Sequence, residues 1–158
     1  MVKKLEIAYF AAGCFWGIEE AFRTTKGVLS TKVGYTGGHT KNPSYKEVCT
    51  DTTGHAEAVQ VTFDPKTVTF TQLLNLFWSL HDPTTMNRQG PDIGSQYRSA
   101  IFYVTEVQKE QALKSKEIAQ KKFKKPIVTE IVKASDFYDA EEYHQQYLKK
   151  NGGATCHF

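Results

Sequence analysis

One cysteine of the chain stands between a glycine and two large aromatic side chains, in the run Gly13-Cys14-Phe15-Trp16-Gly17. The apolar run Leu5–Phe10 before it is typical of a strand, and the apolar residues of 18–22 are spaced as in a helix. The thiol is therefore expected at a strand-to-helix turn, where free backbone N–H groups favour the thiolate, the nucleophilic form of cysteine. The neighbouring rings predict that an apolar group approaches the sulfur. This combination indicates an enzyme with a reactive cysteine beside an aromatic pocket.

Four further segments are rich in side chains that can do chemistry. One is irregular and holds a tyrosine, one leads into a strand, one is long and full of turn formers, and one contains a Gly-Gly pair. They are Asn42–Cys49, Thr53–Val59, His81–Ser99 and Gly152–Phe158. The third segment has no periodicity, and loops of its length in compact domains are usually functional, so we expect a surface loop from His81 to Arg98.

Taken in order, these segments and the cysteine turn resemble the A-type peptide methionine sulfoxide reductases. The resemblance runs from about Ala8 to Tyr147. It rests on Gly-Cys-Phe-Trp-Gly (13–17), Gly-His-Ala-Glu (54–57), His-Asp-Pro-Thr (81–84) and Gln-Tyr-Arg-Ser (96–99). It implies thiol-dependent reduction of the S epimer of methionine sulfoxide in peptides, and it leaves the free amino acid open as a second substrate. No metal, flavin or nucleotide cofactor is expected, because the chain has neither a Cys-x-x-Cys pair nor a Gly-x-Gly-x-x-Gly loop.

Reduction of a sulfoxide requires a nucleophile on sulfur and a proton on the departing oxygen. Cys14 is expected to supply the nucleophile and to become a sulfenic acid. The resemblance assigns the proton to Glu57, since a carboxyl shielded from water stays protonated at neutral pH. It assigns Tyr45 and Tyr97 to hydrogen-bond the sulfoxide oxygen, and Asp92 to fix the polar network of the pocket.

The resemblance also assigns Phe15 and Trp16 to an aromatic wall that receives the S-methyl group. On periodicity alone, core packing is the better explanation of both rings, and only their adjacency to Cys14 reverses that preference. Glu57 interrupts the apolar alternation of its strand, so a solvent-facing carboxylate is the default there. His144 and Tyr147, spaced one helical turn apart, are weaker candidates for the pocket rim, and a helix face packed on the core would explain them as well.

Three other motif residues and two of the assigned ones have simple structural explanations. His81, Asp82 and Arg98 are interpreted as scaffold that makes loop hydrogen bonds and ion pairs. Asp92 follows a proline and could be an ordinary turn residue. Cys14 could be a small inert core residue, since free cysteine is often buried.

A second thiol is needed to reduce the sulfenic acid. Cys156 lies three residues beyond a Gly-Gly pair, in a tail from about 151 that is expected to be mobile enough to reach the site. Cys49 lies in a segment that looks packed, so Cys156 is the preferred candidate. The resemblance implies a Cys14–Cys156 disulfide that thioredoxin reduces by exchange.

Two other kinds of function compete with the reductase. A cysteine hydrolase needs a histidine base beside the thiol, and His55 is the one histidine near a motif that could serve. A binding module would hold a methylated or oxidised side chain in the aromatic pocket without turnover. Neither explains the tail cysteine, Cys156.

The pattern of elements predicts an α+β fold in a single domain over residues 1–158. We expect a two-layer α/β sandwich with a mixed sheet, a ferredoxin-like core and long functional loops. The strands are expected over Leu5–Phe10, Leu29–Tyr35, Ala56–Phe63, Ser99–Val104 and Ile127–Val132. Helices are expected around Leu73–Leu80 behind a capping box of Thr69 and Gln72, over Val107–Phe123, and over Ala140–Lys150.

The composition argues against several classes of partner. A net charge of +3, arising largely between Lys109 and Lys125, is too small to indicate nucleic-acid binding and fits a solvated helix face.

No apolar stretch has membrane-spanning length, and no signal peptide is recognised. Three cysteines without a close pair argue against a disulfide framework and favour reduced thiols in the cytoplasm. We expect a monomer that acts on oxidised proteins or peptides.

Overall fold

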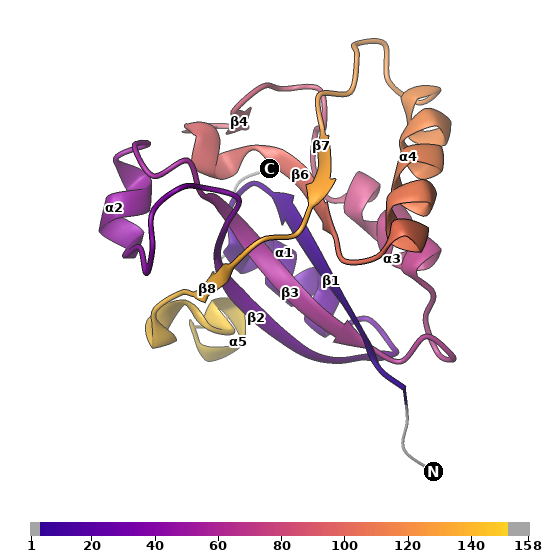
Figure 1. Ribbon diagram of the computed structural model, residues 1–158, viewed down its shortest axis with the longest axis horizontal. Coiled ribbons are helices and arrows are strands. Elements are labelled where there is room, and N and C mark those ends of the chain that lie inside the picture. Colours follow the sequence, from indigo (N-terminus) through magenta and orange to yellow (C-terminus); the bar gives the residue numbers. More distant parts are fainter. Residues whose placement is uncertain (1–3, 152–158) are drawn as a thin grey trace.

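A mixed six-stranded sheet forms the centre of the computed structural model, which describes residues 4–151 (Figure 1). The strand order is β7-β6-β1-β3-β2-β8, and neighbours are antiparallel except β6 and β7, which are parallel. The strands are β1 (Glu6–Ala12), β2 (Val28–Thr36), β3 (Ala56–Phe63), β6 (Ser99–Tyr103), β7 (Glu130–Lys133) and β8 (Phe137–Asp139). The expected α+β fold with a mixed sheet is confirmed, and the order of the four central strands is compatible with a ferredoxin-like core.

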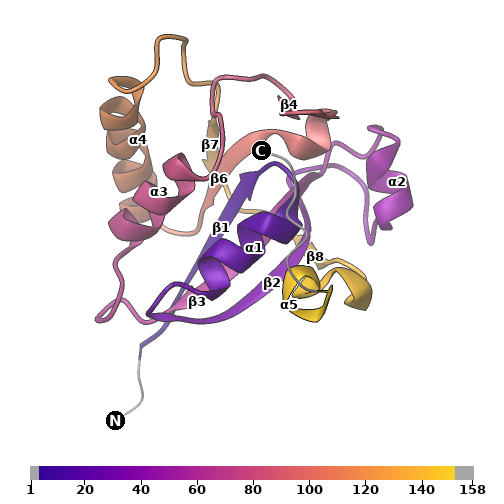
Figure 2. The same cartoon turned by 180° about the vertical axis from the view of Figure 1, so that it is seen from behind.

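The helices α1, α3 and α4 cover one face of the sheet, and α1 lies across β1, β3 and β2 (Figure 2). The helices are α1 (Phe15–Arg23), α2 (Tyr45–Cys49), α3 (Phe70–Ser79), α4 (Glu106–Gln120) and α5 (Tyr147–Asn151), with single 3-10 turns η1 (Ser95–Tyr97) and η2 (Glu142–His144). The main core lies between this face and α1 and α3. Its centre is Phe10, whose ring stands 4.8 Å from that of Phe22 and 5.4 Å from that of Phe77.

A smaller apolar cluster lies on the opposite face of the sheet. Its centre consists of short side chains from β1, β3 and β6, which let the chain approach the sheet closely. The connection from β7 to β8 crosses this face (Figure 1), and Ala134 and Phe137 pack on the cluster. Both faces of the central strands are therefore covered, which explains why β3 has buried residues on either side.

Local capping explains where two of the helices begin. The expected box before α3 is present: Thr69 Oγ1 accepts from the Gln72 N–H at 3.1 Å, and Gln72 Oε1 accepts from the Thr69 N–H at 2.8 Å. The same box, made by Ser44 and Glu47, begins α2 in a segment that sequence reasoning left irregular. A helix of five residues is too short for hydrophobic periodicity to reveal.

The expected continuous helix over Ala140–Lys150 is wrong. The segment forms η2 and α5, separated at Gln145 and Gln146, and Gln146 adopts a positive φ of 51°. The Gln145 side chain accepts from the Val33 N–H at 2.9 Å and donates to the Val33 carbonyl at 2.8 Å. These bonds to β2 hold the segment out of a helix.

The expected surface loop from His81 to Arg98 is only partly correct. It contains the short hairpin β4 (Arg88–Gln89) and β5 (Asp92–Ile93), followed by η1. His81, Gln89 and Gln96 are buried, and the side chains of His81 and Gln89 form hydrogen bonds with the backbone and with neighbouring side chains. None of the helices between residues 4 and 151 combines the length and the apolar character needed to cross a bilayer.

Candidate active site

Cys14 occupies the turn between β1 and α1, as the sequence predicts. It is the N-cap residue of α1, and its side chain makes no capping hydrogen bond. Gly13 before it has φ of 97°, a conformation that favours glycine, and a Cβ there would lie 2.8 Å from Cγ of Gln89. The turn is thus packed tightly beneath β4, with its sulfur-bearing residue at the start of a helix.

Glu57 lies beside this turn, on the helix-covered face of β3. It is 1% exposed, so the solvent-facing default for this position is wrong; α1 and the segments around it cover the strand. Oε1 accepts a hydrogen bond from the Phe15 N–H at 3.2 Å, whereas Oε2 has no partner among the described residues. Burial, together with the charge of Asp92, outweighs the hydrogen bond from Phe15 and raises the pKa of Glu57 to about 8. The carboxyl is therefore protonated at neutral pH.

Two tyrosines from separate elements face this carboxyl. Tyr45 begins α2 and Tyr97 ends η1, and the Glu57 carboxylate, after burial, is the largest contributor to the raised pKa of both. The pKa of Tyr97 rises to about 12, and its phenol interacts with that of Tyr45. Asp92 acts electrostatically on Glu57 and on Tyr97. The structure thus brings together the four polar residues that the sequence assigned to one site.

The rings of the two aromatic residues after the cysteine both lie against the ring of His144. Phe15 is 1% exposed and Trp16 is half-buried. The Trp16 ring stacks on Tyr147 with centroids 3.9 Å apart, and its Nε1–H donates to Nδ1 of His144 at 3.0 Å. The His144 ring also lies 4.4 Å from that of Tyr45. Both weaker candidates, His144 and Tyr147, therefore contact Trp16, although they belong to separate elements and not to one helix.

His144 has one nitrogen that no group of the described chain satisfies. Nδ1 accepts from Trp16, so the neutral ring carries its proton on Nε2, and this atom is buried without a partner in the part of the chain that the structure describes. Burial lowers the pKa of His144 and so favours the neutral ring.

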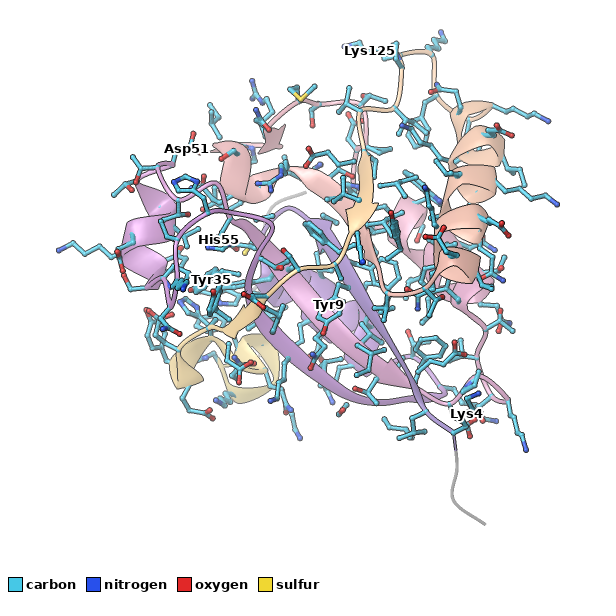
Figure 3. All side chains as sticks on the ribbon, viewed as in Figure 1. Lys4, Tyr9, Tyr35, Asp51, His55 and Lys125 are labelled. Atoms are coloured by element: carbon cyan, nitrogen blue, oxygen red, sulfur yellow. The ribbon has the colours of Figure 1, made fainter. Side chains whose placement is uncertain are left out.

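Sequence reasoning missed two residues that support the site. The Tyr35 hydroxyl donates to Oε1 of Glu141 at 2.9 Å, and the Tyr45 backbone N–H donates to Oε2 of Glu141 at 2.9 Å. Tyr35 lies near the end of β2 on the side of α2 and α5 (Figure 3). No local pattern could have revealed these bonds, because Glu141 lies about a hundred residues from both tyrosines.

The remaining motif residues lie in the scaffold, as expected. His81 contacts the Phe77 carbonyl at 2.9 Å and Ser99 Oγ at 2.7 Å, and Arg98 donates to Glu130 at 2.7 Å. They connect α3, β6 and β7 rather than line the pocket.

Three further candidates from the sequence are His55, Cys49 and Cys156. Both nitrogens of His55 are occupied, by the Gly38 N–H at 3.0 Å and the Thr40 carbonyl at 2.7 Å, so it does not serve as a base for a hydrolase. Cys49 is a free, exposed thiol that interacts with the Tyr45 phenol, so the expectation that it occupies a packed position is wrong. Cys156 lies outside the described residues.

This geometry suits transfer of an oxygen atom to a thiol. A nucleophile at a helix start stands beside a protonated carboxyl with one unpaired oxygen and beside two phenols, with aromatic rings on the adjoining side. A family model described as peptide methionine sulfoxide reductase matches residues 6–158. The chain belongs to this family.

Curated relatives agree with the family over nearly the whole chain. The chain is similar to peptide methionine sulfoxide reductase MsrA of Methanosarcina acetivorans, with 65% identity over 150 residues that cover 94% of this chain and 80% of the relative. It is also similar to the MsrA of Methanothermobacter thermautotrophicus, with 56% identity over 158 residues that cover 99% of this chain and 94% of the relative.

Solved structures of methionine sulfoxide reductases share the fold. Reduced Mxr1 from Saccharomyces cerevisiae matches with a TM-score of 0.92 at 42% identity, covering 97% of this chain and 90% of that chain. Methionine sulfoxide reductase A of Corynebacterium diphtheriae matches with a TM-score of 0.88 at 42% identity, covering 96% of this chain and 77% of that chain. The α+β architecture is therefore that of the methionine sulfoxide reductases.

Proposed function

We propose that this protein is a thiol-dependent reductase that converts the S epimer of methionine sulfoxide to methionine. The observation that carries the proposal is the buried Glu57 carboxyl. It is protonated at neutral pH, is anchored by one oxygen to the amide after Cys14, and presents its other oxygen without a partner among the described residues. A sulfoxide oxygen supplies the acceptor that this oxygen's proton needs.

We propose that four residues carry out the reductive step. The Cys14 thiolate attacks the sulfoxide sulfur while Glu57 donates its proton to the sulfoxide oxygen. Tyr45 and Tyr97 hydrogen-bond that oxygen as negative charge builds on it. The oxygen passes to the cysteine sulfur, so the products are a Cys14 sulfenic acid and the thioether, and the substrate sulfur is reduced by two electrons.

The aromatic side of the pocket gives the substrate its orientation. Phe15 and Trp16 receive the S-methyl group, since sulfur and methyl groups pack favourably on aromatic rings. Tyr147 and His144 hold the Trp16 ring by stacking and by a hydrogen bond. With the methyl group fixed there and the oxygen fixed at Glu57, a single configuration at sulfur places the third substituent toward solvent. This supports selectivity for one epimer.

We propose that Cys156 completes the cycle. Its thiol attacks the Cys14 sulfenic acid, water leaves, and the resulting disulfide is reduced by thioredoxin through exchange. One of the structurally similar proteins is Mxr1 from Saccharomyces cerevisiae in complex with Trx2, at a TM-score of 0.67 and 32% identity. Although Cys49 is exposed, partial desolvation and the nearby Glu57 and Glu141 carboxylates raise its pKa and so lower its thiolate fraction, which makes Cys49 the weaker candidate.

The setting of the enzyme follows from this cycle. A cytoplasmic location fits, because thioredoxin and its reductase keep thiols reduced there. One copy of the chain supplies Cys14, Glu57, Tyr45 and Tyr97, and we propose that it acts as a monomer in which residues 1–158 form one catalytic domain.

The decisive experiment uses methionine sulfoxide peptides resolved into S and R epimers, with a thioredoxin system as reductant. Turnover of the S epimer alone is the expected result. If the protein with reduced Cys14 turns over neither epimer, the reductase proposal is wrong. The Cys156→Ser variant should complete one turnover and lose most thioredoxin-linked activity; full activity in that variant would transfer the recycling role to Cys49 or to direct reduction.

A further inference from the structure

Glu141 takes no part in the reaction described above, yet both of its oxygens contact tyrosines of the site. Oε1 accepts from the Tyr35 hydroxyl and Oε2 from the Tyr45 backbone N–H, each at 2.9 Å. Tyr35 belongs to β2, Tyr45 to α2, and Glu141 directly precedes η2. One carboxylate therefore joins β2 and α2 to a segment about a hundred residues further along the chain, near the Tyr45 phenol that interacts electrostatically with Glu57.

The contact with Tyr45 acts on the first residue of a very short helix. The capping box of Ser44 and Glu47 satisfies the N–H groups of those two residues. The Tyr45 N–H points instead to Glu141, which lies 96 residues further along the chain. This bond ties the beginning of α2 to the body of the protein and so sets the position from which the Tyr45 side chain projects.

The hydrogen bond from Tyr35 connects the same carboxylate to strand β2 of the sheet. Tyr35 is opposite Glu57 in the register of β2 and β3, and its ring lies 5.8 Å from that of Phe15. The side chain is fully buried. Burial and the neighbouring Glu141 carboxylate raise the pKa of Tyr35, so its hydroxyl keeps the proton that it donates. Glu141 is therefore positioned by a rigid part of the sheet.

Glu141 is ionised, which strengthens both bonds. Burial alone raises its pKa, but the hydrogen bonds from the Tyr45 amide, from its own backbone and from Tyr35 lower it, and the net pKa is below the ordinary value. Hydrogen bonds to an ionised acceptor are roughly twice as strong as neutral ones. The link from the sheet to α2 is thus stronger than an ordinary surface contact.

We propose that Glu141 is a positioning residue for the reductive step: by holding the start of α2, it places the Tyr45 phenol against the sulfoxide oxygen. The inference rests on the proposed function, since it concerns the same step. Glu141 touches no reacting atom and acts through Tyr45. Its loss should therefore slow the chemical step, with little change in the substrate concentration needed for half-saturation.

The test is a double-mutant cycle in single-turnover reduction of an S-epimer peptide. Glu141→Gln replaces one acceptor oxygen by an NH2 group, so one of the two tyrosine donors loses its acceptor, and the rate constant should fall roughly tenfold. In a Tyr45→Phe background the same substitution should change the rate constant by less than about twofold, because the phenol that it would misplace is already absent. Equal losses in both backgrounds would show a purely structural role and overturn the proposal.

Two further variants keep the outcome clear. Glu142→Gln is the matched control, since that carboxylate is 89% exposed and pairs only with Lys150 in a 3.4 Å surface contact; it should behave as wild type. Tyr35→Phe removes one donor from Glu141 and should lower the rate constant by about twofold to threefold, again only when Tyr45 is present. A wild-type rate in Glu141→Gln would overturn this inference alone, whereas inactivity of the wild type would overturn the proposed function and this inference with it.

Discussion

Glu19 and Glu57 are buried to the same extent but have different partners. Each is 1% exposed, and burial raises the pKa of both. Glu19, on α1, accepts from the Thr31 hydroxyl at 2.8 Å and from the Gln146 N–H at 2.7 Å, so both of its oxygens are satisfied. Glu57 accepts on one oxygen, and the other has no partner in the described part of the chain. The hydrogen bonds of Glu19 fix the segment that follows η2. Oε2 of Glu57, in contrast, can form a hydrogen bond with a group from outside the protein.

Two buried histidines differ from each other in the same way. His81 has contacts on both nitrogens and connects α3 to β6, while His144 in the pocket has one nitrogen without a partner among the described residues. Depth of burial thus does not by itself mark the site. What distinguishes Glu57 and His144 from Glu19 and His81 is a buried polar atom without a partner, although Thr40 Oγ1 and Gln96 Oε1 also lack one among the described residues.

The sharpest test of this comparison replaces each carboxyl by an amide. Glu57→Gln removes the transferable proton and should slow the reductive step by about a hundredfold or more. Glu19→Gln should leave the rate constant within about twofold, because no group in the pocket depends on the charge of Glu19. Single-turnover reduction at neutral pH measures both. Similar losses in the two variants would mean that the free oxygen of Glu57 has no special role.

The pH dependence of the reductive step should report the same proton. Glu57 has a pKa of about 8, so its acid form predominates below that pH and its carboxylate above it. The single-turnover rate constant should decline above about pH 8, approaching tenfold for each pH unit. In Glu57→Gln this alkaline decline should be absent. If the decline is identical in the two proteins, another group supplies the proton.

The stability of the fold should respond to acid through His81. Burial lowers the pKa of His81 from 6.5 to about 4, so the unfolded chain binds more protons between these values. The neutral ring therefore contributes stability that is present above pH 6.5 and is lost as the pH falls toward 4. Urea unfolding should show a decline of roughly 1 kcal/mol per pH unit in this window. His81→Asn should flatten the decline without changing the alkaline profile of the reductive step.

The smallest expected effect concerns the stability contributed by Glu19. Its replacement by glutamine leaves one of two donors, Thr31 or Gln146, without an acceptor, which should lower the free energy of unfolding by about 1 kcal/mol. Glu142→Gln, at an exposed position, is the control and should leave the urea midpoint unchanged. An unchanged midpoint in Glu19→Gln would show that the two bonds are not needed by the fold.

Local patterns predicted most of the sheet but not the parts that complete the pocket. The strand over Ala56–Phe63 was predicted with its observed bounds, since apolar β-formers and turn residues mark it locally. β8 has three residues and was missed, because so short a run gives no periodic signal. The break at Gln145 and Gln146 was missed because it depends on bonds to β2 and to Glu19, which no local pattern contains.

The candidate site was predicted in part for a similar reason. The turn at Cys14 could be predicted, because the strand, the glycine and the helix that form it are adjacent in the sequence. The burial of Glu57 could not be predicted, because the alternation of residues along β3 is uninformative when both faces of the sheet are covered. Glu141 could not be assigned from the sequence, because its partners Tyr35 and Tyr45 lie about a hundred residues away. The motif resemblance placed the reacting groups, while their support came only from the tertiary structure.

The two edge strands of the sheet, β7 and β8, come from one stretch of chain, residues 130–139. Only after this stretch does the chain provide Glu141 and His144. A chain leaving the ribosome folds from its N-terminus, and pairings between distant segments form last. Cys14 is therefore synthesised early, whereas His144 and Tyr147, which hold the Trp16 ring, are synthesised late. A nascent chain therefore carries its reactive thiol well before residues 140–151 are synthesised and His144 and Tyr147 can hold the Trp16 ring beside it.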